Sequence, residues 1–171
     1  SSAASDVYKR QVVVARHQIA AGKLWKAVTK RYVAVVKGIP QPAEGLIDLP
    51  LEREVPLEMK RIVSPEGERA VTEYRVLAAA PDRSCALVGF ILHTGRTHQI
   101  RVHMAEKGWP LLGDTKYCTP ESLRKNRALN LQQQVLCAWR LRFTGVPEGS
   151  PLSYLNGREF HAKKLPDDWV K

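Results

Sequence analysis

The chain has 171 residues, of which 44% are hydrophobic, a proportion sufficient for one folded domain with a buried core and too high for a disordered tail. Its formal net charge of +10 favours a polyanion such as nucleic acid as partner over an acidic protein or a bare membrane, although a soluble basic protein without such a partner explains the charge equally well. No apolar run is long enough to cross a bilayer, and no secretory pattern opens the chain, so we expect a cytoplasmic protein that binds no membrane.

The N-terminal part changes character abruptly. The opening SSAASDVYKRQ is polar and unpatterned, whereas the VVVA that follows it is typical of the end of a buried strand. We therefore expect residues 1–11 to be a non-native or artefactual leader, and residues 12–171 to form the domain. Apolar residues near helical spacing predict a helix over residues 17–29, and the β-branched run RYVAVVKG, residues 31–38, predicts a strand that ends at glycine.

The middle of the chain has the alternating and β-branched patterns of strands. After the loop IPQPAEG, the segment LIDLPLE predicts a short extended piece, and residues 57–69 form a polar connection that contains proline and glycine. AVTEYRVLAAA and SCALVGFILHT then predict two strands joined by the turn PDR.

A helix is predicted from Thr97 to Lys107, with Thr94 or Thr97 as its cap and with Gly108 and Pro110 as its terminators. Further on, TPESLRKNRALN predicts a short basic helix, because a threonine suited to an N-cap precedes a proline suited to the first helical position.

The C-terminal part is predicted to be rich in strands. VLCAWRLRF has a strand pattern, and the pieces around Ser153 and from Glu159 to His161 complete this part. Runs of strands with a few helices indicate an α+β fold with a largely antiparallel or mixed sheet.

Arg101 is the residue that most needs an explanation. At the spacing of one helix face, the predicted helix carries His98, Arg101, Val102 and Ala105. Arg101 should therefore be partly buried, and because an unpaired buried guanidinium costs on the order of several kcal/mol, a carboxylate or a phosphate should face it. The plain alternative is a structural ion pair with one of three carboxylates, Asp48, Glu73 or Asp114.

Two further side chains have a functional and a plain interpretation. Arg96 lies beside Gly95 just before the helix, where free N–H groups and the positive end of the dipole favour an anion; the alternative is a solvated loop arginine. Tyr32 shares one strand face with Ala34 and Val36. It is either a half-buried core tyrosine or an aromatic surface that stacks with an unpaired base.

Neither the cysteines nor the histidines predict a metal site. Cys85, Cys118 and Cys137 are odd in number and lack CxxC spacing, so we expect them to be reduced and packed. His98 and His103 are five residues apart, which points them away from a shared metal on a helix. The sequence also lacks GxSxG, GxxxxGK[ST] and GxGxxG, so serine hydrolase, P-loop and dinucleotide interpretations have no support.

The segment HTGRTHQIRVHMAEKGWPLLGDTKY resembles the C-terminal motif of RluA-type pseudouridine synthases, in which GR[ST]HQ[IL]RVH is followed by GHP and GDxxY. KRYVAVVKG is similar to that family's K-x-Y-x-A-x-V segment, PAEGLIDLPL to the loop and strand that follow it, and AVTEYRVL to the next strand. The resemblance runs from Val12 to about Trp169. It implies the pseudouridine synthase fold, an α+β fold with a mixed, mainly antiparallel bent sheet and flanking helices, here N-terminally truncated.

Members of this family convert a uridine in structured RNA, such as rRNA or tRNA, to pseudouridine without a cofactor or a metal. They detach the base, turn it and rejoin it through carbon. The resemblance implies that Arg101 pairs with the catalytic aspartate, keeping it ionised and aimed. It also implies that Tyr32 packs against the flipped base and helps to move its proton.

The same resemblance implies RNA-binding roles for four further residues. Lys30 would lie close to the site, Arg96 would contact the RNA backbone, and His98 and Gln99 would shape the surroundings of the pocket. For His98 and Gln99 we favour hydrogen-bonded support of the helix start over direct contact with RNA. We expect a monomer with structured RNA as its partner.

One departure from the family pattern concerns the catalytic aspartate itself. In the family it lies in an HRLDxxTSG segment directly before the strand that here corresponds to VVVA, and this sequence has no such segment. Counting back from Ala15 places the aspartate's column on Ser5, and Asp6, one position away, would point to the opposite face of a strand. We therefore do not assign Asp6 as nucleophile, and we expect a partial catalytic domain that is inactive by itself. The alternative function is a catalytically inactive RNA-binding module.

Overall fold

The computed structural model describes residues 27–55 and 60–162, which belong to two compact units. We refer to residues 33–136 as the larger unit and to residues 27–32 with 137–162 as the smaller unit. Strand β1 (Val28–Lys37) has its first half in the smaller unit and its second half in the larger one. The leader expected at residues 1–11, Asp6 and most of the helix expected at 17–29 lie outside the described residues.

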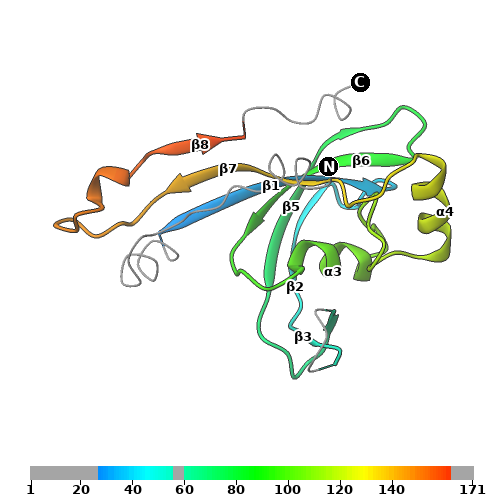
Figure 1. Ribbon diagram of the computed structural model, residues 1–171, viewed down its shortest axis with the longest axis horizontal. Helices are drawn as coiled ribbons and strands as arrows, with labels where there is room; N and C mark the ends of the chain where they lie inside the picture. Colours follow the sequence, from blue (N-terminus) through cyan, green and yellow to red (C-terminus); the bar gives the residue numbers. More distant parts are fainter. Residues whose placement is uncertain (1–26, 56–59, 163–171) are drawn as a thin grey trace. The chain divides into compact units, whose positions relative to one another are not determined.

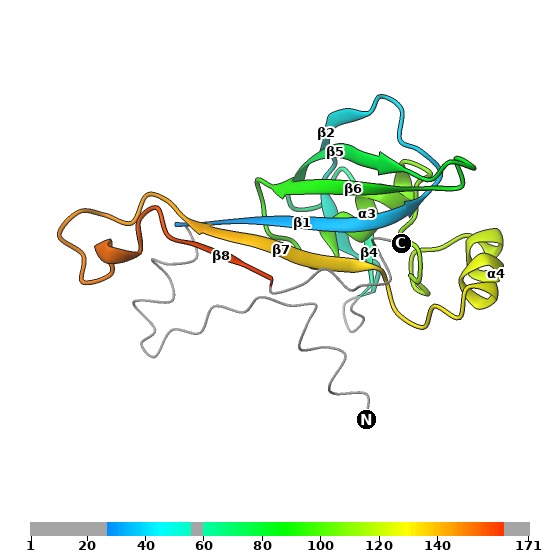
Figure 2. The same cartoon turned by 90° about the horizontal axis from the view of Figure 1, so that it is seen from above.

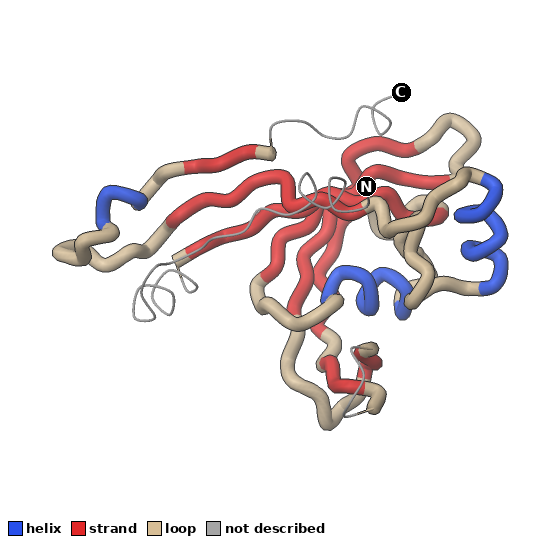
Figure 3. The backbone as a smooth tube through the Cα atoms, viewed as in Figure 1, coloured by secondary structure: helices blue, strands red, loops and turns tan. Residues whose placement is uncertain are grey.

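The larger unit contains a sheet in the strand order β2-β5-β6-β1 (Figures 1 and 2). Its other strands are β2 (Glu44–Asp48), β5 (Val71–Ala79) and β6 (Cys85–Leu92), and a separate two-stranded ribbon consists of β3 (Leu51–Arg53) and β4 (Arg61–Val63). β2 pairs antiparallel with β5, β5 with β6, and β3 with β4. Strands predominate over the short helices in Figure 3, and the fold is the α+β fold with a mainly antiparallel sheet that the sequence predicts.

The alternation of the sequence explains which side chains of this sheet are buried. On β6, Ala86, Val88 and Phe90 are buried and alternate with partly exposed neighbours, as the two-residue period of a strand requires. Helix α3 (Gln99–Glu106) packs against β4 and β5, with Val102 in a buried cluster that also contains Leu51, Ala70 and Tyr117. Burial of this apolar face holds a helix that is too short to be stable alone.

The start of α3 differs from the expected cap. The helix begins at Gln99 rather than Thr97, and its N-cap is His98, whose φ of 58° is left-handed and whose side chain makes no capping bond. Thr94, one of the two expected caps, instead accepts a hydrogen bond from the backbone N–H of Val71. The capping prediction was therefore wrong, because a tertiary contact takes the threonine oxygen. At the other end, Gly108 terminates the helix as expected, with a φ of +83°.

The second helix agrees closely with its sequence pattern. α4 (Pro120–Ala128) has Thr119 as N-cap, and the threonine side chain accepts a hydrogen bond from the N–H of Ser122 at 3.1 Å. Pro120 occupies the first turn, where its missing N–H costs nothing.

The smaller unit contains the strand order β1-β7-β8 (Figure 2). β7 (Leu136–Phe143) pairs antiparallel with β8 (Glu159–His161), and the chain between them includes the 3₁₀ turn η1 (Ser153–Leu155). Ala27, Leu141, Phe143 and Val146 form its buried cluster.

Three further sequence predictions need correction. The piece around Ser153 is a 3₁₀ turn rather than a strand, because the backbone N–H groups of Leu155 and Asn156 bond three residues back. Val28 and Thr29 begin β1 instead of ending a helix. The connection over residues 57–69 contains strand β4, which its polar composition hid.

None of the helices in the described part of the chain is long and apolar enough to span a membrane. The three cysteines are free thiols; Cys137 is buried, whereas Cys85 and Cys118 are partly exposed.

A buried polar network connects α3 to β5. The His103 ring is fully buried, with Nδ1 2.9 Å from Thr72 Oγ1 and Nε2 3.0 Å from the carbonyl oxygen of Leu49. A carbonyl can only accept, so Nε2 carries the proton and the Thr72 hydroxyl donates to Nδ1. Burial lowers the pKa of His103 below its ordinary value, although the Leu49 carbonyl and Asp48 oppose this, so the ring is neutral in the folded protein.

The neutral ring predicts acid sensitivity. Below the ordinary pKa of 6.5 the imidazole is protonated in the unfolded chain but stays neutral in the folded chain. As the pH decreases below 6.5, this group therefore lowers the free energy of unfolding by up to about 1.4 kcal/mol per pH unit. Urea unfolding of His103→Gln should therefore show a smaller loss of stability between neutral pH and pH 5 than the original chain does. His93→Gln, at an exposed histidine, is the control; an equal loss in all three proteins would contradict the assignment.

Candidate active site

The centre of the candidate site is an ion pair between helix α3 and the turn that follows it. Arg101 Nε donates to Asp114 Oδ2 at 2.7 Å, and Arg101 Nη2 donates to Asp114 Oδ1 at 2.8 Å. The Arg101 side chain is 12% exposed and the Asp114 side chain is fully buried. The partial burial expected for Arg101 is confirmed. The pair with Asp114 is the structural ion pair of the plain alternative, in which Asp48, Glu73 and Asp114 were the possible partners.

Asp114 is held as a fixed anion. Its Oδ1 also accepts hydrogen bonds from the backbone N–H groups of Lys116 and Tyr117, at 2.9 and 3.0 Å. Burial raises the pKa of Asp114, but the bonds from Arg101 and these amides outweigh burial and leave the pKa below its ordinary value. Asn126 of α4 fixes the turn further by accepting from the Gly113 N–H and donating to the Asp114 carbonyl.

Tyr117 links this pair to the helix start. The Arg101 guanidinium lies 4.9 Å from the centre of the Tyr117 ring, a distance at which a cation and an aromatic face attract. The Tyr117 hydroxyl accepts from the Arg61 N–H and lies 2.8 Å from His98 Nδ1. Burial, followed by the charges of Arg101 and Lys116, lowers the pKa of His98, which favours a neutral imidazole.

Gln99 supports the start of the helix from inside. Its side chain is buried, and Oε1 accepts from the Arg96 N–H and from the Thr94 hydroxyl, both at 2.9 Å. Its Nε2 donates to the Val71 carbonyl and to Thr72 Oγ1. All four bonds are within the protein.

Arg96 is tied to a neighbouring loop. Its Nε donates to the Arg69 carbonyl at 3.0 Å, and Nη1 lies 3.2 Å from a carboxylate oxygen of Glu68. The Arg96 side chain is 36% exposed and that of Glu68 is 64% exposed, so solvent screens this pair.

Lys30 and Tyr32 lie in the smaller unit, two residues apart on β1, and therefore share one face of that strand. Burial raises the pKa of the half-buried Tyr32 phenol and lowers the pKa of the Lys30 ammonium. The structure thus gathers Arg96, His98, Gln99 and Arg101 around the start of α3, and Lys30 with Tyr32 on β1.

The guanidinium of Arg101 is only partly used. Within the described residues both of its hydrogen bonds come from the Nε–Nη2 edge, whereas a guanidinium has five N–H donors. Its Nη1 and the outer hydrogen of Nη2 have no hydrogen bond among these residues. Chemically, this edge is suited to aim a carboxylate and to stabilise its negative charge.

Sequence reasoning assigned no role to Tyr117, Thr72 or Asn126. The GDxxY spacing was a usable signal for Tyr117, because it places the tyrosine three residues after the buried aspartate. Thr72 and Asn126 carry no comparable signal, since their partners are 27 and 13 residues away in the chain.

In the part of the chain described by the structure, no three His, Cys, Asp or Glu side chains cluster as metal ligands.

Comparison with known proteins gives one consistent family. Residues 11–106 match the model of the family described as RNA pseudouridylate synthase. The dual-specificity RNA pseudouridine synthase RluA of Salmonella typhi is 46% identical over 108 residues, which cover 63% of this chain and 49% of RluA. The RNA pseudouridine synthase YjbO of Bacillus subtilis is 43% identical over 165 residues, which cover 94% of this chain and 53% of YjbO. The chain thus spans about half the length of the curated relatives that it matches.

A solved structure agrees with these matches. Human RNA Pseudouridylate Synthase Domain Containing 4 superposes with a TM-score of 0.62 at 27% identity, covering 89% of this chain and 64% of that one.

Asp114→Asn should show how much the ion pair contributes to stability. Because the substitution leaves the Arg101 charge without a partner, we expect the free energy of unfolding to fall by about 3 kcal/mol, toward the lower end for a buried pair since Arg101 is slightly exposed. Asp48→Asn removes an exposed partner of Arg69 and should cost less than about 1 kcal/mol. Urea unfolding measures both; equal losses would contradict the importance of the buried pair.

Gly113→Ala tests the turn that carries Asp114. Gly113 has a φ of +74°, and an added Cβ would lie 1.9 Å from the carbonyl oxygen of Gln133, so the backbone would have to move. We expect a loss of at least about 2 kcal/mol, against about 1 kcal/mol for Gly108→Ala, whose φ is +83° and whose Cβ would meet nothing within 4 Å. Thermal unfolding distinguishes them, and similar melting temperatures would refute the steric argument.

Proposed function

Because this chain belongs to the RNA pseudouridylate synthase family, we propose that it forms part of an enzyme that isomerises uridine to pseudouridine in a structured RNA, either ribosomal or transfer RNA. The observation that carries the proposal is the guanidinium of Arg101, which is fixed on one edge by the buried carboxylate of Asp114 and has no hydrogen bond on the other edge within the described residues. We propose that the reaction needs no cofactor, and that the protein acts as a monomer in the cytoplasm.

The proposed task of Arg101 is to hold the catalytic aspartate with its open edge. A carboxylate that attacks in a water-poor pocket must remain ionised, and an adjacent guanidinium lowers its pKa. Asp114 contributes by fixing the guanidinium plane, which would otherwise be free to rotate toward solvent. In this proposal Asp114 is a positioning residue, since it acts through Arg101.

The proposed task of Tyr32 is to contact the flipped base. Its raised pKa keeps the phenol protonated at neutral pH, so it offers both an aromatic surface and a proton. Lys30, on the same strand face, is proposed to meet the phosphate of the flipped nucleotide.

Around the start of α3, Arg96 is proposed to exchange its screened contact with Glu68 for the RNA backbone. His98 and Gln99 are proposed to keep that start in place, through Tyr117 and Thr72 respectively.

The proposed nucleophile is the aspartate of an HRLDxxTSG segment, and the printed sequence contains no such segment. We therefore propose that this chain binds RNA but does not catalyse the isomerisation, and that the reaction requires the HRLDxxTSG segment. Should the chain prove to be a binding module only, RNA binding would persist without any chemistry.

Release of tritium from RNA labelled at C5 of uridine tests the proposal. A chain with an HRLDxxTSG segment placed before Val12 should release tritium from total cellular RNA. The same chain with Asn in place of that aspartate should not, and Arg101→Ala should reduce the rate by about a hundredfold or more, because the nucleophile is no longer aimed. The chain as printed should bind RNA with an affinity that falls as salt rises.

Two results would count against the enzyme. If the extended chain releases no tritium from any cellular RNA, the enzymatic proposal is wrong, and the catalytically inactive RNA-binding module is the remaining function. Near-normal release by Arg101→Ala would remove Arg101 from the proposed reaction.

A further inference from the structure

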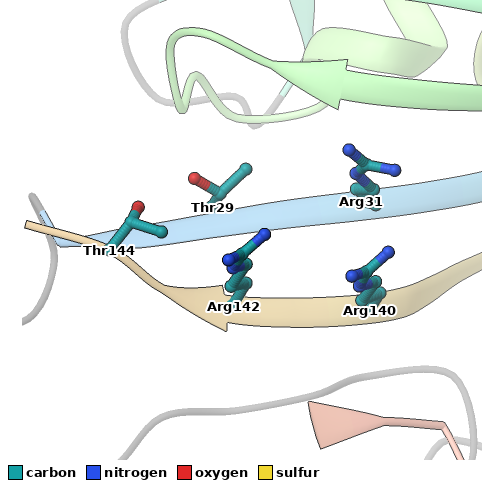
Figure 4. Close-up of a pocket in the computed structure, with 5 residues that line it drawn as sticks. All are labelled: Thr29, Arg31, Arg140, Arg142 and Thr144. Carbon is teal, nitrogen blue, oxygen red and sulfur yellow. The ribbon is translucent and has the colours of Figure 1, made fainter. Parts of the chain in front are cut away.

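The smaller unit carries a cluster of arginines that the proposed reaction does not use. A hollow of about 180 Å³ is lined by Thr29 and Arg31 of β1 and by Arg140, Arg142 and Thr144 along β7 (Figure 4). We call these five residues the arginine face. The side chains of these residues are three guanidiniums and two threonine hydroxyls, so they offer hydrogen-bond donors and positive charge, and no carboxylate is among the lining residues.

The strand register explains why these side chains lie on the same face of β1 and β7. The Thr144 N–H donates to the Ala27 carbonyl at 2.7 Å, which pairs the end of β7 with the start of β1 in an antiparallel arrangement. Counting inward places Thr29 opposite Arg142 and Arg31 opposite Arg140, as Figure 4 shows. Like charges directly opposite each other in a sheet repel, so the Arg31–Arg140 pair costs stability in the absence of an anion.

The chain neutralises this face only in part. Glu159 of β8 lies opposite Arg142 and forms ion pairs with Arg140 and, at 3.4 Å, with Arg142. One carboxylate thus serves two guanidiniums, while the side chain of Arg31, an exposed residue, has no ion pair or hydrogen bond within the described residues. In addition, Arg140 Nε is buried without a hydrogen-bond partner there. The face therefore has spare donors and an uncompensated positive charge.

The arginine face is separate from the side chains assigned to the base. Successive residues of a strand point to opposite faces, so Thr29 and Arg31 point away from the face that carries Lys30 and Tyr32. A ligand of the arginine face is therefore not the nucleotide held by Tyr32.

We propose that the arginine face is an accessory site for the phosphates of the RNA backbone, outside the site of the isomerised base. The inference rests on the proposed function in taking RNA as the ligand. Guanidiniums bind phosphate oxygens through paired N–H groups, and such contacts position a nucleic acid without sequence preference. The two cross-strand rows, Thr29 with Arg142 and Arg31 with Arg140, are about 6.6 Å apart along the strands, a spacing comparable with that of consecutive phosphates.

Fluorescence anisotropy with a labelled transfer RNA transcript, over a series of salt concentrations, tests the site in the intact chain. Arg31→Gln should weaken binding roughly fivefold near 0.1 M salt and should reduce the salt slope by about 0.7, as the loss of one phosphate contact requires. Arg83→Gln, an equal change of charge at an exposed turn residue in the larger unit, is the control and should change neither quantity. Equal effects of the two substitutions would overturn the site in favour of general charge.

Glu159→Gln gives a test of opposite sign. Removing the carboxylate frees Arg140 and Arg142, so binding should strengthen and the salt slope should steepen, provided that circular dichroism shows an unchanged fold. Unchanged or weaker binding by a folded Glu159→Gln chain would overturn the proposal. If Glu159→Gln does not fold, the Arg31→Gln comparison decides alone.

Two further measurements distinguish a failure of the accessory site from a failure of the proposed function. If the original chain binds no RNA, the RNA partner of the proposed function fails and the accessory site fails with it; if the chain binds but Arg31→Gln binds equally well, only the accessory site fails. Inorganic phosphate at matched ionic strength should not displace the RNA. Displacement that depends on Arg31 would make this a site for a small free anion and would overturn the RNA assignment.

Discussion

The bidentate ion pair between Arg101 and Asp114 is the interaction on which the rest of the candidate site depends. Two charges withdrawn from water are tolerable only when their geometry is good and their remaining hydrogen-bonding groups are satisfied. The structure meets both conditions, since Asp114 accepts two backbone amides in addition to the guanidinium. The pair also joins the GRTHQIRVH and GDTKY segments of the sequence, so that the helix and the turn are one structural unit.

A second, uncharged hydrogen-bond network fixes the position of α3 against β5. The Thr72 hydroxyl accepts from Gln99 and donates to His103, so one side chain of the strand contacts two side chains of the helix. Such a network stabilises only when every member has a partner, and each of these three has one. A one-residue slip of the helix would leave three buried polar groups unsatisfied.

Much of the fold was predictable because it follows from local patterns. The alternation of hydrophobic and polar residues, the β-branched runs and the Thr119–Pro120 cap predicted the positions of β1, β5, β6, β7 and α4. The cap of α3 was not predictable, because Thr94 bonds to an amide 23 residues away and His98 adopts a backbone conformation usual for glycine. The choice of Asp114 among three carboxylates also depends on tertiary geometry. The arginine face needed the register of β1 against β7, since Arg31 and Arg140 are far apart in the sequence.

The left-handed backbone of His98 has an evolutionary consequence. Glycine at this position would relieve about 1 kcal/mol of strain, but it would also remove the imidazole that bonds to Tyr117, a contact of similar worth. The two effects nearly cancel, so selection for folding alone is almost indifferent to which residue is present. Position 98 is therefore one at which a side chain larger than glycine costs the fold almost nothing, in spite of its left-handed backbone.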